Sequence, residues 1–186
     1  MHVFAKPLTV FSLIAALAMV ALPAEPRAET PSDAESHMLM DHAELARIPT
    51  EIELAVDAKN WPHARSFFAD DVRVDFTSLV GGEPAIIPSD DLITGWAANL
   101  TGNKESLHMR GWPLIDVDGD RATVRSNGYA YNKLPGAPDG SGDLWEVWGH
   151  YTHDFERTED GWKVVGFTFE MTHERGSDWV KTTPGS

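Results

Sequence analysis

Apolar residues recur at helical spacing in the first part of the chain. Between residues 41 and 61, Leu45, Ile48, Ile52 and Val56 fall on one face of a helix with a period of 3.6 residues. Pro49 interrupts this pattern and predicts a kink or a restart. We expect a second short helix over residues 61–71. A third is expected over residues 87–102, where acidic residues occupy the first turn and a glycine ends the pattern.

Strand patterns take over in the second half of the chain. Residues 72–76 alternate between apolar and polar, and four longer runs rich in aromatic and β-branched residues follow over residues 105–117, 121–134, 144–157 and 161–174. The last three runs are preceded by the turn signals "DGD", "PGAPDGSGD" and "TEDG". Helices followed by an antiparallel meander predict an α+β fold. Such a sheet curls into a cone with the N-terminal helices on its concave face, and the open end of the cone is a pocket.

The first 28 residues resemble a secretory signal peptide. They carry Lys6, an uncharged run over residues 8–22, and small residues at Ala24 and Ala28. The run is short for a membrane span, although an uncleaved N-terminal anchor is the alternative. We therefore expect a secreted or periplasmic protein with three parts: a signal peptide over 1–28, a flexible lead-in over 29–40, and one α+β barrel domain over 41–186.

Charge and composition limit the classes of molecule that we expect the protein to bind. The net charge of −14 becomes about −15 once residues 1–28 are removed, which argues against nucleic acid and against an anionic membrane surface. The chain has no cysteine, so disulfides, thiol nucleophiles and thiolate metal sites are excluded. A small molecule is the expected ligand.

Metal and cofactor signatures are also missing from the sequence. His150 and His153 are three residues apart on an expected strand, so they face opposite sides and do not clamp one ion. No HExxH motif, no GxSxG motif and no Gly-rich phosphate loop after a strand occurs. We expect neither a metal nor a cofactor.

Three motifs and the order of the elements resemble one family. "FADDVRVDF", "DVDGDRATV" and "YTHDFERTEDGWKVVGF" are similar to the SnoaL-like branch of the nuclear transport factor 2-like superfamily, over most of the chain from about Asp41 to Trp179. The resemblance implies a cone-shaped α+β barrel. Polyketide cyclases, steroid isomerases and dehydratases share that fold, so the fold alone does not fix an activity.

Within that branch the pattern is most similar to scytalone dehydratases, and this resemblance implies three catalytic residues. "VDAKNW" resembles the segment with the pocket aspartate, which is Asp57 here. His108 in "SLHMRGW" and His150 in "VWGHYTH" match the two pocket histidines. From the residues alone, the favoured interpretation is that His108 is a hydrogen-bonded core histidine and Asp57 a helix-end residue in a turn, and the family resemblance reverses this preference.

The same resemblance implies the substrate-binding residues. Phe76 in "VRVDFTS" stands where the family has a water-binding tyrosine, and Thr168 and Glu170 in "VVGFTFE" stand where it has small polar pocket residues. Because neighbouring side chains of a strand alternate, an inward His150 places Trp148 inside the cone as well.

Strand alternation then predicts an assembly. If Thr168 and Glu170 point inward, Phe167, Phe169 and Met171 lie on the convex face, where we expect them to form the interface of a homodimer or homotrimer. A covering helix or the C-terminal tail is the alternative. If the alternate set of side chains faced inward instead, the interior of the cone would be apolar and His150 and Glu170 would lie outside.

Two classes of function follow. The first is a cofactor-free lyase or isomerase, dehydratase-like, that acts on a small cyclic or aromatic hydroxy or keto compound through a His–Asp dyad. The alternative is a non-catalytic periplasmic binding protein for a small hydrophobic ligand, and a purely structural oligomer is a third possibility. The discriminating feature is whether Asp57, His108 and His150 converge on one enclosed volume.

Overall fold

The computed structural model describes residues 32–138 and 140–186, so the expected signal peptide, residues 1–28, lies outside the described residues. Residues 32–186 form one compact unit. In chain order its elements are α1 (Asp33–Asp57), α2 (Trp61–Arg65), β1 (Phe68–Asp75), α3 (Thr77–Val80), β2 (Ala85–Pro88), α4 (Ser89–Asn99), β3 (Glu105–Arg110), β4 (Leu114–Asp118), β5 (Arg121–Lys133), β6 (Leu144–Thr158), β7 (Gly161–Gly176) and α5 (Asp178–Thr182).

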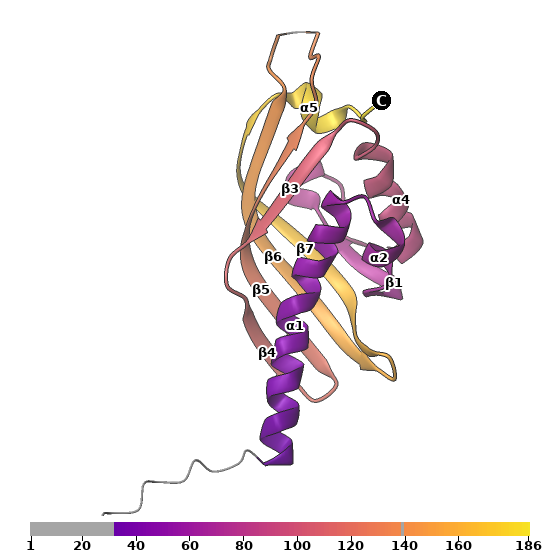
Figure 1. Ribbon diagram of the computed structural model, residues 1–186, viewed down its shortest axis with the longest axis vertical. Coiled ribbons are helices and arrows are strands. Elements are labelled where there is room, and N and C mark those ends of the chain that lie inside the picture. Colours follow the sequence, from indigo (N-terminus) through magenta and orange to yellow (C-terminus); the bar gives the residue numbers. More distant parts are fainter. Residues whose placement is uncertain (1–31, 139) are drawn as a thin grey trace, which may run out of the picture. The chain divides into compact units, whose positions relative to one another are not determined.

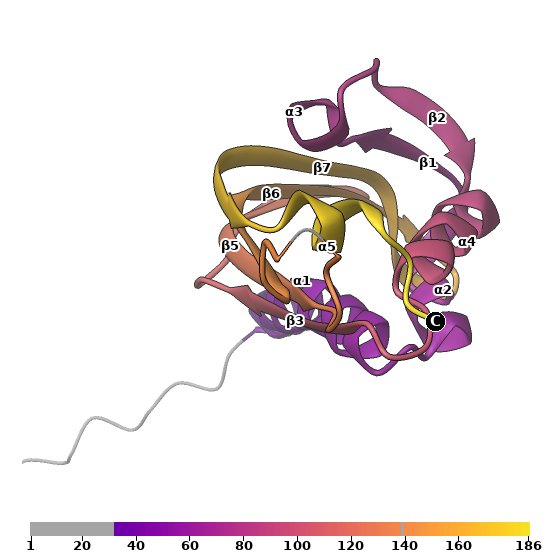
Figure 2. The same cartoon turned by 90° about the horizontal axis from the view of Figure 1, so that it is seen from above.

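One curved sheet of seven strands organises this unit. The strand order is β2-β1-β7-β6-β5-β3, and β4 also pairs with β5 (Figure 1). Seen from above, the sheet wraps around an interior whose open side is closed by α1, α2 and α4 (Figure 2). The expected α+β fold with a curved sheet is confirmed. One detail differs, because β1 pairs with β7 in parallel while the other neighbours are antiparallel.

Helix α1 is longer than the pattern predicted. Ser32 caps it by accepting a hydrogen bond from the Glu35 amide, and the Glu35 carboxylate accepts one from the Ser32 amide in return. Residues 33–40, expected as a flexible lead-in, are therefore helical. The helix also runs through Pro49, which is buried between Ile48 and Ile52, so packing on the sheet offsets the missing backbone hydrogen bond.

Strand β7 changes its phase in the middle. Asp154 pairs with Gly166 and Phe155 with Val164, so Val165 is an extra residue in the ladder, a β-bulge. Before the bulge even-numbered residues such as Val164 are buried, and after it the odd-numbered Phe167 and Phe169 are buried. A bulge of this kind reverses which side chains face the core.

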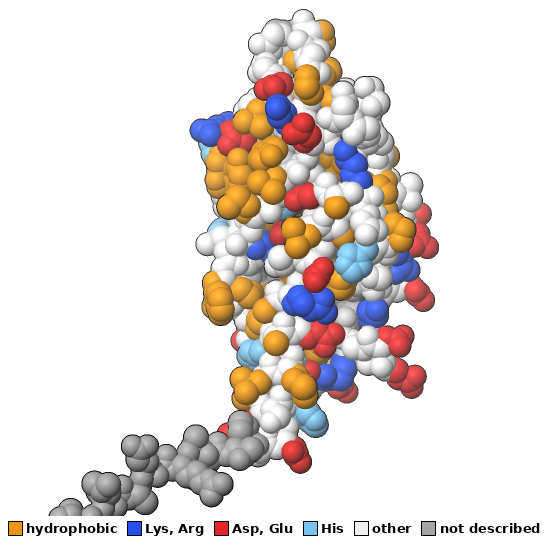
Figure 3. Space-filling view, in the orientation of Figure 1, with side chains coloured by type: hydrophobic (Ala, Val, Ile, Leu, Met, Phe, Trp, Pro, Cys, Tyr) orange, Lys and Arg blue, Asp and Glu red, His pale blue; other side chains and the backbone are white. Residues whose placement is uncertain are grey.

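The expected strand over residues 105–117 is divided in two. Gly111, Trp112 and Pro113 separate β3 from β4, and the Trp112 side chain is 91% exposed. Near it in the chain, Leu107, Met109 and Leu114 are 38, 56 and 67% exposed. In the view of Figure 3, which has β3 in front, hydrophobic side chains gather among charged ones on the surface.

The helices of the described part do not include one that is both long and apolar enough to cross a membrane.

Candidate functional site

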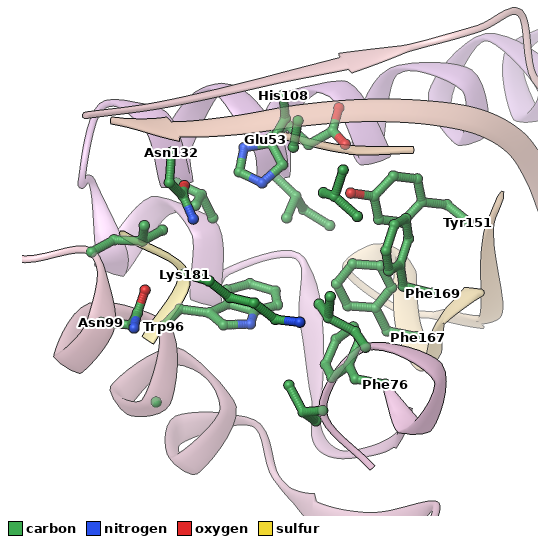
Figure 4. A pocket seen from close by; sticks show the side chains of 18 of the residues that line it. Glu53, Phe76, Trp96, Asn99, His108, Asn132, Tyr151, Phe167, Phe169 and Lys181 are labelled. Carbon is green, nitrogen blue, oxygen red and sulfur yellow. The ribbon is translucent and has the colours of Figure 1, made fainter. Parts of the chain in front are cut away.

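A cavity of about 370 Å³ lies on the concave side of the sheet. Its lining residues come mainly from helices α1, α3, α4 and α5 and from strands β3, β5, β6 and β7, and their side chains point into the cavity from several sides (Figure 4). Most of its lining is apolar, with Val56, Phe76, Leu79, Trp96, Val147, Phe167 and Phe169 among the contributors. Its polar and charged lining residues are Glu53, Asn99, His108, Arg110, Asn132, Tyr151 and Lys181.

Asp57 and His108 meet at the edge of this cavity. Asp57 is the last residue of α1, and β3 carries His108 beside it. The His108 Nδ1 lies 2.7 Å from Asp57 Oδ1, and the His108 backbone amide donates to Asp57 Oδ2 at 2.8 Å. Ser106, two residues earlier on β3, donates its hydroxyl to Asp57 Oδ1 at 2.8 Å. The close contact that the sequence predicted is therefore present, and His108 lines the cavity.

The hydrogen bonds keep Asp57 charged. Burial alone would raise the pKa of this carboxyl, but the hydrogen bonds from His108 and Ser106, together with the attraction of the imidazole, outweigh burial and hold the pKa below its usual value. A charged carboxylate on Nδ1 fixes the imidazole tautomer, so Nε2 is the ring nitrogen left for proton transfer.

A buried ion pair lies next to this dyad. The Arg110 Nε is 2.7 Å from Glu53 Oε1, with both side chains more than nine-tenths buried, although the N–H direction is too bent for a hydrogen bond. Burial raises the pKa of the Glu53 carboxyl, and the Arg110 charge acts against that rise. The pair adds a cation and a carboxylate to the lining without a net charge.

Tyr151 contributes a hydroxyl from β6. Figure 4 shows its oxygen pointing into the interior, on the side where Glu53 and His108 lie. The Arg110 guanidinium lies 4.0 Å from the centre of the Tyr151 ring. Burial raises the pKa of this phenol, so it stays protonated near neutral pH.

His150 and Glu170 do not reach this cavity. Both are exposed, and they line a separate shallow hollow of about 300 Å³ together with Trp112 and Arg125. The His150 ring contacts Asn127 at 2.9 Å instead of the dyad. His150 therefore does not converge with Asp57 and His108 on one enclosed volume, its predicted catalytic role is wrong, and only the Asp57–His108 pair remains of the three predicted catalytic residues.

Trp148 and Thr168 also lie away from the cavity. Trp148 is half-buried between Tyr129 and His173, with ring centres 5.1 and 5.3 Å away. Phe76 alone of the four predicted substrate-binding residues lines the cavity. The sheet adopts the opposite phase to the predicted one because turning Tyr151, Phe167 and Phe169 inward removes their large apolar surfaces from water.

The predicted interface changes for the same reason. Phe167 and Phe169 are buried in the core of their own chain, and Met171 packs partly against that core. These side chains are therefore not an exposed patch, and the argument that placed them between subunits is wrong. The homodimer or homotrimer stays a prediction.

Sequence reasoning missed Glu53, Arg110 and Tyr151. A signal for Tyr151 was present in the mid-strand Gly128, because a glycine inside a strand often marks a close approach of another group. A Cβ atom on Gly128 would lie 2.1 Å from the Tyr151 ring, and one on Gly149 would lie 2.7 Å from the Phe169 ring. Arg110 was readable as the residue two positions after His108 on the same face of β3.

Within the described ranges no group of three or more histidine, aspartate and glutamate side chains is arranged to hold a metal ion.

Comparison with known proteins gives one family and one curated relative. The profile of the SnoaL-like domain matches residues 37–168. An uncharacterised protein, MT2978 of Mycobacterium tuberculosis (strain CDC 1551 / Oshkosh), is 29% identical over 129 residues, which cover 68% of this chain and 82% of that protein.

Solved structures share the fold. The Kfla4162 protein from Kribbella flavida superposes with a TM-score of 0.70 at 24% identity, covering 78% of this chain and 99% of that one. A protein assigned as a scytalone dehydratase from Novosphingobium aromaticivorans DSM 12444 has a TM-score of 0.63 at 16% identity, covering 76% of this chain and 91% of the other. At 24% and 16% identity, these comparisons show a shared fold and nothing more.

Proposed function

The chain belongs to the SnoaL-like domain family, within the nuclear transport factor 2-like superfamily, and from this premise we propose that it is a cofactor-free lyase or isomerase of the dehydratase type. Its substrate is a small cyclic or aromatic hydroxy or keto compound. The observation that carries the proposal is the His108 imidazole, which lines the cavity while its Nδ1 lies 2.7 Å from the Asp57 carboxylate.

His108 acts as the general base in this proposal. Its Nε2 takes a proton from a carbon next to a carbonyl group, and the negative charge of Asp57 stabilises the imidazolium that results. The same imidazolium then returns the proton, either to another carbon, which completes an isomerisation, or to a departing hydroxide, which leaves as water. Either route conserves protons and needs no cofactor.

The cavity supports the proposed class of substrate. Its volume of about 370 Å³ lies within the usual range of small-molecule sites, roughly 300 to 1,000 Å³. Trp96, Phe76 and Phe167 provide flat apolar walls that fit a ring. The family and a neighbour assigned as a dehydratase support the same chemistry.

The apolar lining also favours a second candidate, a binding protein that holds a hydrophobic ligand without converting it. Trp96 and Trp145 line the cavity, and aromatic side chains bind ring-shaped ligands without any need for a base. In that case substitution of His108 would leave affinity nearly unchanged, whereas Trp96→Leu would weaken it.

Asp57→Asn is the test that separates the two candidates. The amide keeps the shape of the carboxylate but cannot stabilise an imidazolium, so turnover should fall by about 10²- to 10⁴-fold while ligand affinity is kept. The measurement is the rate of water loss or isomerisation across a panel of cyclic β-hydroxy ketones, together with ligand affinity by calorimetry.

Two matched variants serve as controls. Asp116→Asn changes an exposed aspartate that pairs with Arg125 on the surface, and His150→Gln changes the exposed histidine outside the cavity. Both should keep turnover within about twofold, in the range of ordinary surface substitutions. A turnover substrate whose rate is the same with Asp57→Asn as with these controls would refute the dyad.

A further inference from the structure

The Tyr151 hydroxyl is a polar group of the cavity that the proposed function does not yet use. Its residue lines the cavity from the centre of β6, and Figure 4 shows the oxygen directed into the interior, on the side of Glu53 and His108. Among the described residues, neither a side chain nor a backbone atom forms a hydrogen bond with this hydroxyl. Its donor is therefore free for a molecule inside the cavity.

The ring that carries this hydroxyl is tightly held. Gly128 on β5 leaves the space that the ring fills, since a Cβ there would lie 2.1 Å from Tyr151 Cε2. The Phe169 ring lies 4.6 Å away, and the Arg110 guanidinium lies 4.0 Å from the Tyr151 ring centre. Contacts on several sides fix the direction of the hydroxyl before a ligand arrives, which lowers the entropy cost of binding.

The hydroxyl is also limited to one role. Burial raises the pKa of the phenol, so it remains a donor and does not become a base near neutral pH. A ligand that fills the cavity takes away the hydrogen bond that water can give this hydroxyl. An oxygen atom on a ligand restores that hydrogen bond, whereas a hydrocarbon does not.

We propose that Tyr151 binds the carbonyl oxygen of the substrate and thereby selects cyclic ketones over hydrocarbons of the same shape. The proposal deepens the proposed function and rests on it for the identity of the base. When His108 removes a proton from the carbon next to the carbonyl, the C–H electron pair forms the enolate. The charge gathers on the oxygen that Tyr151 holds, and Tyr151 keeps its own proton throughout.

The second half of an elimination also balances. The enolate electrons re-form the carbonyl and expel a hydroxyl group from the next carbon, and the proton on His108 joins that hydroxide to give water. The products are an unsaturated ketone and one water molecule. No oxidant, reductant or further reactant takes part.

A pair of ligands tests Tyr151 without any turnover. α-Tetralone and tetralin have the same fused rings and differ in the ketone oxygen. The wild-type protein should bind the ketone more tightly than the hydrocarbon. In Tyr151→Phe the dissociation constant of the ketone should rise by about 2- to 10-fold, the size of one hydrogen bond, while that of tetralin stays the same.

Tyr129→Phe is the matched control, because the Tyr129 hydroxyl donates to Glu146 at 2.9 Å and its residue does not line the cavity. This variant should keep the full preference for the ketone. Two results would overturn the proposal: an unchanged preference in Tyr151→Phe, or an equal loss of affinity for both ligands, which indicates a packing role.

Failure of this inference and failure of the proposed function can be told apart. His108→Gln addresses the base, and its effect is read in turnover of the β-hydroxy ketones. The tetralone preference addresses Tyr151 alone and is read in binding. If ketone preference depends on Tyr151 while His108→Gln keeps full turnover of a substrate, the oxygen site stands and the base is wrong.

Discussion

His153 is a histidine buried without any hydrogen bond from the described residues. Its side chain is fully buried, both ring nitrogens lack partners, and its ring lies 4.4 Å from that of Phe167. Burial holds the pKa of His153 well below its usual value of 6.5, so the ring is neutral in the folded protein. Each unpaired nitrogen costs free energy that an apolar side chain would not.

Replacement of this residue should stabilise the protein, and more so in acid. At neutral pH, His153→Leu should raise the free energy of unfolding by about 1 to 3 kcal/mol, because it removes unpaired polar atoms. Below pH 6.5 the His153 imidazole becomes protonated in the unfolded chain, whereas in the folded protein it stays neutral because its pKa is well below 6.5. Wild-type stability then falls by up to about 1.4 kcal/mol per pH unit through this group.

The gap between His153→Leu and wild type should therefore widen from pH 7 to pH 5, as measured by urea unfolding. His42→Leu, the same change at an exposed position on α1, should show no such widening. A constant gap would mean that folded His153 accepts a proton.

At the scale of elements, two glycines show how backbone space is used. Gly128 lies under the Tyr151 ring in β5, whereas Gly95 in α4 has no heavy atom within 4 Å of a Cβ position. Gly128→Ala should lower the free energy of unfolding by about 1 to 3 kcal/mol through overpacking. Gly95→Ala should raise it by about 0.5 to 1 kcal/mol through helix propensity. Chemical denaturation of both variants checks the opposite signs, and equal stabilities would contradict the packing argument.

Elements were more predictable from the sequence than the direction of their side chains. Periodicity identified the main helices and long strands, and the Asp57–His108 contact followed from a family resemblance. The start of α1 was readable in Ser32 and Glu35, which match a capping box. The bulge at Val165 was not readable, because an extra residue in a ladder is set by pairing with the neighbouring strand and leaves no local pattern.

The candidate site was predictable only in part for the same reason. His108 and Phe76 line the cavity as predicted, but His150, Trp148, Thr168 and Glu170 depended on the strand phase. The burial of Tyr151, Phe167 and Phe169 decided that phase. Tertiary packing therefore decides which side chains of β6 and β7 face the cavity, and strand alternation alone does not.

At the scale of the described domain, Lys104 joins parts distant in the sequence. Its fully buried ammonium group donates to Asn99 Oδ1 at 2.7 Å and to the Thr183 backbone oxygen at 2.9 Å, with the Lys181 oxygen at 3.5 Å. These contacts attach the segment after α5 to the end of α4. Burial lowers the pKa of Lys104 to about 8.

The lowered pKa of Lys104 predicts that the stability of the protein depends on pH in the alkaline range. Between about pH 8 and the usual value of 10.5, the folded protein has released this proton while the unfolded chain still holds it. Stability from this group therefore rises with pH in that window, by at most about 1.4 kcal/mol per unit. The measurement is unfolding of wild type and Lys104→Met from pH 7 to 10, where the difference should shift in favour of wild type only above pH 8. A difference that stays flat across pH 8 to 10 would contradict it.

The placement of Trp112 has an optical consequence. Of the seven tryptophans, Trp112 is 91% exposed, whereas Trp96 and Trp145 line the cavity. An anionic quencher such as iodide reaches Trp112 from solvent, while an aromatic ketone bound as we propose would contact Trp96 and Trp145. In Trp112→Phe the iodide-sensitive emission should decrease, and binding of an aromatic ketone should still change the emission of Trp96 and Trp145, which reports cavity occupancy without any label.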